Sequence, residues 1–150
     1  MKNLYDPACA AELRTRLDAL RVDSPRQWGK MTPSQVVAHC AVPFEWAFGD
    51  VRPPRMLIGR ILGGLVKGRL LGNDDPMRRN SPTTPDLVIT DERDLEKERV
   101  KLRGLMQRFV DSGPAGCTTN PHPFFGTLTP QEWATLMYKH MDHHLRQFGA

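Results

Sequence analysis

Hydrophobic residues recur every three or four positions in several stretches of this chain, which is the spacing of one face of an α-helix. A segment that opens at Asp6-Pro7 carries one such row, and a longer segment from about Asp91 to Asp111 carries another. The rows consist of Leu13, Leu17 and Leu20, and of Leu95, Leu102, Leu105, Met106 and Phe109. The run Leu87-Val88-Ile89 is too short to indicate a sheet. The pattern therefore predicts an all-α protein.

Two further helix starts, at residues 32–36 and 129–133, have nearly the same sequence. Each begins with Thr-Pro and has Gln or Glu three positions after the Thr. Thr can cap the first backbone N–H groups, Pro fits the first helical turn, and Gln or Glu can close a capping box. Hydrophobic residues on both sides of each cap fit a hydrophobic staple. We therefore predict helices that begin at Pro33 and Pro130.

A fifth segment, from about Pro54 to Leu71, is apolar but contains four glycines between Gly59 and Gly68. This spacing allows the close approach of another helix, and a helix that lies on a membrane surface is the alternative. Two basic residues, Arg60 and Lys67, argue against a membrane span. Residues 72–85 are polar and proline-rich, which predicts a long loop.

Composition and length indicate an ordinary globular chain. It has 150 residues, of which 39% are hydrophobic and 25% charged, so we expect a single helical domain over residues 1–150. The N-terminus lacks the apolar region of a signal peptide, and we expect a cytoplasmic protein. Cysteines are odd in number and far apart, which favours reduced thiols at Cys9, Cys40 and Cys117.

The net charge of +4 is concentrated between Arg52 and Arg79, where seven residues are basic and two are acidic. Such a segment can attract phosphate or an acidic surface. A solvated basic flank is the commoner explanation. No Gly-rich phosphate loop, nucleophile motif or nucleic-acid-binding signature accompanies it, so we expect no nucleic-acid partner.

The five histidines include candidate metal ligands. His140 and His144 are four residues apart, so their rings project from the same face of a helix. The same face carries apolar Trp133, Leu136 and Met137, which indicates that the pair points inward. His39, in the preceding Thr-Pro helix, is the candidate third ligand. A core histidine and a chance surface pair would give the same spacing, so the residues alone leave these alternatives open.

Other residues near the predicted ligands are candidates for supporting roles. Gln35 lies one turn before His39, and His143 could line the entrance to a site. For His122, in an aromatic loop before the last helix, packing against the bundle end is the favoured interpretation over contact with a substrate. Asp142 is expected to be exposed, and Cys40, about 100° around the helix from His39, to be a core thiol.

Residues 138–149 resemble the last helix of the DinB/YfiT-like superfamily, which ends in an HxxxH pair and an HHRGQ-like string. Here the string reads His143-His144-Leu145-Arg146-Gln147, with Leu-Arg in place of Arg-Gly. His39 matches the metal-binding histidine of the superfamily's second helix. Residues 28–32, 80–83 and 122–148 resemble one branch of that superfamily, a domain of unknown function.

The resemblance implies a DinB-like four-helix bundle with up-down-down-up topology, an additional short helix and a long polar loop. It also implies a homodimer and a divalent metal, with Zn or Ni favoured and Fe or Mn as alternatives, held by His39, His140 and His144. Three neutral imidazoles leave an open position, at which a metal lowers the pKa of bound water to about 7 or binds a thiol.

We therefore expect a metal-dependent hydrolase or a transferase that uses a low-molecular-weight thiol and acts on a small-molecule substrate. A non-catalytic metal- or ligand-binding bundle is the alternative.

Overall fold

The computed structural model describes all 150 residues and contains five α-helices, two short 3₁₀ turns and no β-strand. The all-helical prediction is therefore confirmed. The α-helices are α1 (Pro7–Ala19), α2 (Pro33–Phe48), α3 (Leu57–Leu71), α4 (Leu95–Ser112) and α5 (Pro130–Arg146). The 3₁₀ turns are η1 (Pro85–Leu87) and η2 (Pro114–Gly116).

Capping residues determine where the helices begin. Thr32 accepts a hydrogen bond from the backbone N–H of Gln35, whose side-chain oxygen accepts one from the Thr32 N–H, at 3.2 and 2.9 Å. Thr129 and Glu132 form the same capping box at α5, at 3.2 and 2.8 Å. Both predicted capping boxes are confirmed.

Two helix starts differ from the prediction. The fourth helix begins at Leu95 rather than near Asp91, because the Asp94 side chain caps it by accepting from the Lys97 N–H at 2.9 Å. The third begins at Leu57, after an extended stretch that includes Pro54, and has no side-chain cap.

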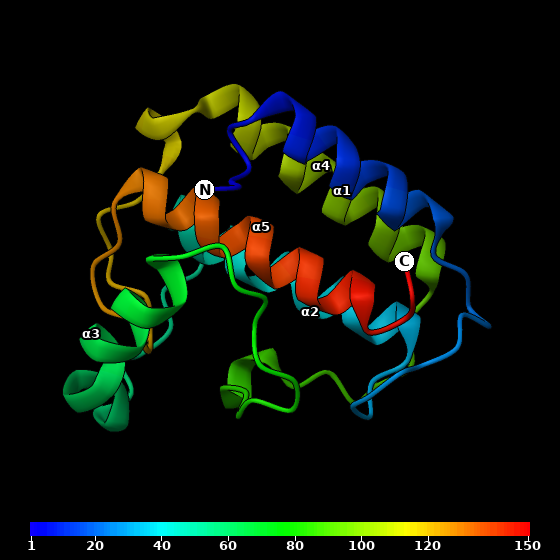
Figure 1. Ribbon diagram of the computed structural model, residues 1–150, viewed down its shortest axis with the longest axis horizontal. Helices are drawn as coiled ribbons and strands as arrows, with labels where there is room; N and C mark the ends of the chain where they lie inside the picture. Colours follow the sequence, from blue (N-terminus) through cyan, green and yellow to red (C-terminus); the bar gives the residue numbers. More distant parts are fainter.

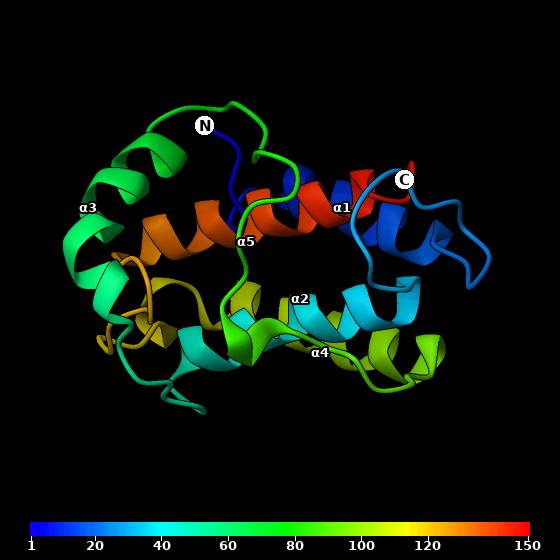
Figure 2. The ribbon, with the colours of Figure 1, turned by 90° about the horizontal axis from the view of Figure 1, so that it is seen from below.

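Four helices pack in a closed ring in which α1 contacts α4, α4 contacts α2, α2 contacts α5, and α5 contacts α1. In Figure 2, α1 and α5 form one layer and α2 and α4 the other. Leu13 and Leu17 of α1, Phe44 of α2 and Met137 of α5 meet in a core of 26 buried residues. The three cysteines are free, as predicted, and Cys40 is buried in this core.

Helix α3 lies outside the ring, at one end of the bundle (Figure 1). Two of its glycines, Gly59 and Gly63, lie so close to the backbone of Phe124 that any Cβ there would overlap the Phe124 carbonyl oxygen. The glycines of α3 therefore allow the loop before α5, rather than another helix, to approach the helix closely. No helix of the protein has the length and apolarity that crossing a membrane requires.

The polar segment between α3 and α4 is a loop, as predicted, and it crosses the face formed by α2 and α5 (Figure 2). Its only regular structure is η1, whose last residue is Leu87. This crossing brings a backbone carbonyl of the loop to the side chain of His39.

Candidate metal centre

His39, His140 and His144 form one cluster in which the three potential ligand atoms lie within 4.8 Å of one another. One histidine comes from α2 and two come from successive turns of α5. Two of the rings are almost completely enclosed, with exposed fractions of 1% for His39 and 8% for His140, whereas His144 is only partly buried. Contact between α2 and α5 in the ring therefore assembles residues 101 positions apart in the sequence.

Two of the rings are held by a hydrogen bond at Nδ1. Nδ1–H of His39 donates to the carbonyl oxygen of Leu87 at 2.6 Å. Nδ1–H of His144 donates to Oε1 of Gln147 at 2.9 Å, and Nε2 of Gln147 donates to the Trp28 carbonyl at 2.7 Å. Protons on Nδ1 leave both rings with a lone pair on Nε2, which is the atom that can bind a metal.

The third ring, His140, faces His39 directly. The Nε2 atoms of His39 and His140 are 2.8 Å apart, so one proton lies between them when both rings are neutral. Two nitrogen ligands about 2.05 Å from a tetrahedral zinc are about 3.3 Å apart, a separation that a small rotation of either ring provides. Nδ1 of His140 is buried and has no hydrogen-bond partner. The donor set therefore fits a divalent metal that prefers imidazole.

Burial keeps the three rings neutral. Desolvation lowers the pKa of His39, lowers that of His140 well below its usual value and lowers that of His144 to about 3. Repulsion from the neighbouring histidines acts in the same direction on His140 and His144. Neutral imidazole is the protonation state that a metal ligand requires.

The structure gives Gln35 and His122 other contacts. The Gln35 amide closes the capping box of α2, and its Nε2 donates to the Asp91 carbonyl at 3.0 Å. Nδ1 of His122 accepts from the backbone N–H groups of Phe124 and Phe125, at 3.1 and 3.2 Å. Burial lowers the pKa of His122 to about 3, so this ring is a neutral acceptor within its own loop.

His143 lies next to His144 and, like it, is partly buried. Its ring centroid is 5.0 Å from that of His144 and 5.5 Å from that of Trp28. The Arg79 guanidinium stacks over the Trp28 ring at 4.2 Å. His143, Trp28 and Arg79 therefore form a row of contacts that begins beside His144.

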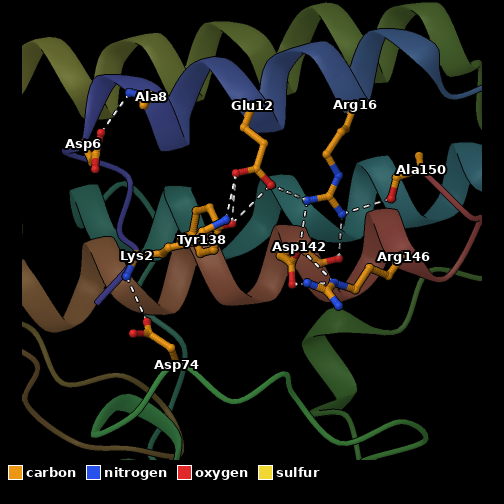
Figure 3. Close-up of polar contacts among 10 residues, drawn as sticks. All are labelled: Lys2, Asp6, Ala8, Glu12, Arg16, Asp74, Tyr138, Asp142, Arg146 and Ala150. Carbon is orange, nitrogen blue, oxygen red and sulfur yellow. Dashed lines mark hydrogen bonds and ion pairs between the residues drawn. The ribbon is translucent and has the colours of Figure 1, made fainter.

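The expectation that Asp142 is exposed was wrong. This carboxylate is 6% exposed and accepts from Arg16 at 2.7 Å and from Arg146 at 2.9 Å (Figure 3). Packing of α1 on α5 covers it with Arg16, which also donates to the Ala150 carbonyl at 3.0 Å. A cavity of about 250 Å³ lies beside Asp142 and Arg146 and is lined by both acidic and basic side chains. That cavity does not include the histidine cluster.

The sequence interpretation missed the two groups that hold the rings. Leu87 was seen only as part of a short apolar run, and a backbone carbonyl leaves no signal in the residue type. Gln147 was noted in the string that carries the family resemblance. Its position three residues after His144 is the signal that could have identified it, since such a residue lies on the same helix face.

The family described as "Protein of unknown function (DUF1569)" matches residues 6–150 of the chain. No curated protein and no solved structure matches the chain.

Proposed function

The chain belongs to this family, and we propose that it is a metal-dependent enzyme in which His39, His140 and His144 hold one divalent ion. The observation that carries the proposal is the convergence of three neutral imidazoles, two of them buried and one partly buried, of which two have Nδ1 fixed by Leu87 and Gln147. A ring held in this way presents its Nε2 lone pair without losing rotational freedom on binding.

Three histidine ligands favour a catalytic ion over a structural one. Structural zinc sites usually have four protein ligands, whereas catalytic sites have three and keep a position for water or substrate. When bound, the ion supplies Lewis acidity that activates water or a thiol at neutral pH. Imidazole donors suit Zn, Ni, Fe and Cu, and we propose Zn or Ni, with Fe or Mn as alternatives.

The residues around the cluster suggest how a substrate would approach. The Leu87 side is closed by η1, and His39 and His140 are enclosed by α2 and α5. His144 is the partly exposed ligand, so we place the substrate on its side, against His143 and Trp28. The Arg79 guanidinium adds a positive charge there, which favours an anionic small molecule.

The resemblance to the DinB/YfiT-like superfamily suggests two reactions, hydrolysis and transfer of a low-molecular-weight thiol. Support for a DinB-like bundle comes from the helix directions in Figure 1, where α1 and α5 run one way and α2 and α4 run the other. The resemblance also suggests a homodimer, which sedimentation at several protein concentrations tests.

The alternative is a non-catalytic metal-binding bundle. Burial of His39 and His140 favours it, as does the position of two cavities, of about 250 and 310 Å³, away from the cluster. An ion closed off by the loop and η1 would stabilise the fold without reacting.

Cobalt substitution distinguishes the two functions, because the visible spectrum of Co²⁺ reports its coordination. We expect protein loaded with Co²⁺ to show a thiolate-to-cobalt charge-transfer band when a small thiol is added, and no band with the corresponding alcohol. The His143→Ala variant, which keeps all three ligands, is the matched control for metal loading. A spectrum that does not change with thiol, azide or hydroxamate would identify a closed site and refute the enzymatic proposal.

A further inference from the structure

Helix α3 exposes an unusually apolar face. Leu57, Ile61 and Leu65 are 77%, 78% and 76% exposed and follow one another at four-residue spacing, so they form one row along the helix. Ile58, Leu62 and Val66 lie beside this row and are also exposed. We call these six side chains the α3 apolar face. Single exposed apolar residues are ordinary, but a contiguous row of this length marks a surface that contacts something else.

The contacts of the opposite face prevent α3 from turning this surface inward. Gly59 and Gly63 lie against the backbone of Phe124, and Lys67 forms an ion pair with Glu132 of α5 at 3.0 Å. Lys139 of α5 donates to the Leu70 carbonyl at 2.6 Å. The α3 apolar face therefore points away from the bundle. The helix itself lies outside the ring of four helices in Figures 1 and 2.

The exposed charges of α3 itself are positive. Residues 51–72 contain five basic residues and no acidic one. Arg60 and Arg69 lie within α3 and are exposed. The neighbouring carboxylates have partners of their own, since Asp50 pairs with Arg108, Asp74 with the N-terminus and Glu132 with Lys67. Asp75, beyond the end of α3, is the exposed acidic exception.

We propose that α3 docks the protein on an anionic lipid membrane, with its apolar face inserted among the acyl chains and its arginines against the headgroups. A short helix with an apolar face and basic flanks lies in the plane of such a surface, with the apolar face buried about 5–10 Å deep. The helix, about 22 Å long, is too short and too charged to cross the membrane and suits this orientation.

Charge complementarity favours the membrane over a second copy of the chain. Two copies joined through the α3 apolar faces would bring together four exposed arginines, Arg60 and Arg69 of each copy, whereas Lys67 is already paired with Glu132. An anionic bilayer supplies the opposite charge, and each basic residue near its surface raises the partition coefficient of the protein about fivefold. This docking is independent of the metal-dependent activity proposed above.

Vesicle co-sedimentation of the full chain tests the proposal. We expect binding to phosphatidylcholine vesicles that contain about 30 mol% phosphatidylserine, and much weaker binding to phosphatidylcholine alone. A triple variant, Leu57→Gln, Ile61→Gln and Leu65→Gln, should lose at least about 100-fold in partitioning, because the apolar insertion is removed while Gln keeps the helix. An Arg60→Gln, Arg69→Gln variant should lose about 30-fold on the anionic vesicles only.

The control is Val22→Gln with Val100→Gln, which changes two equally exposed apolar residues outside α3 and should bind as wild type does. Wild-type protein that binds neither vesicle, or a triple variant that binds as tightly as wild type, would overturn the proposal. A concentration-dependent dimer that the triple variant abolishes, without vesicle binding by wild type, would assign the face to a second copy instead.

Discussion

Gln147 is the residue whose replacement tests most directly how the candidate metal centre is held. The side chain is 2% exposed and makes two hydrogen bonds, one that accepts from His144 and one that donates to the Trp28 carbonyl. Gln147→Leu keeps the approximate volume and removes both bonds. Two polar groups then lose their partners without a large change in packing.

The magnitude follows from the burial of those two groups. An unsatisfied buried donor or acceptor costs about 1–3 kcal/mol. His144 and Trp28 are only partly buried, so water compensates in part. We therefore expect the free energy of unfolding of the metal-free protein to fall by about 2 kcal/mol. Release of the His144 ring should also weaken metal binding about 10- to 100-fold.

Urea unfolding followed by circular dichroism measures the first effect, and competition with a chromophoric chelator measures the second. Gln107→Leu is the matched control, because Gln107 is exposed on α4 and its replacement should change stability by no more than about 0.5 kcal/mol. Equal stability and equal metal affinity in wild type and Gln147→Leu would refute the proposed role of this side chain.

Three further changes probe other parts of the structure. His122→Asn keeps an acceptor for the two loop N–H groups and removes the titrating ring. Because the pKa of His122 is lowered to about 3 in the folded state, its contribution to the free energy of unfolding is complete above pH 6.5 and is lost as the pH falls. Between pH 7 and pH 5, the free energy of unfolding of wild type, measured with urea, should therefore fall by up to about 2 kcal/mol more than that of the variant. Asp142→Asn leaves two arginines without their carboxylate. It should lower the free energy of unfolding by about 2–3 kcal/mol, less than for a fully buried pair because Arg146 is exposed to solvent. A thermal melt equal to that of wild type would contradict this. Gly63→Ala should displace α3 from Phe124 and make α3 more susceptible to limited proteolysis. Gly64→Ala, where a side chain would meet open space, should instead stabilise α3 by up to about 1 kcal/mol. Equal cleavage of the two variants would contradict the close packing of Gly63 on Phe124.

The helices and the histidine cluster could be predicted from sequence because both depend on local rules. Thr-Pro caps with Gln35 and Glu132 specify two helix starts, and four-residue spacing places His140 and His144 on one face. His39 is the candidate third ligand from its place in the other Thr-Pro helix, the family resemblance supports it, and it lies beside the pair in the structure.

The remaining features depend on contacts between distant segments. Asp142 has no local sign of burial, since it is covered by an arginine of α1 that lies 126 residues away in sequence. The Leu87 carbonyl reaches the cluster through a loop whose path no residue pattern reveals. Likewise, the four glycines of α3 predicted a close approach, but not that it would be to the Phe124 backbone, nor that the apolar face would point outward.

Metal content, measured by plasma mass spectrometry on protein purified without a histidine tag, tests the central claim most directly. Wild type, His39→Ala, His144→Ala and the control His122→Asn would each be incubated with Zn, Ni, Mn and Fe, and their folding checked by circular dichroism. We predict about one ion per chain in wild type and in the His122 control, and loss of the ion in both cluster variants. Folded wild-type protein without metal, or cluster variants that retain it, would contradict the assignment of His39, His140 and His144 as a metal site.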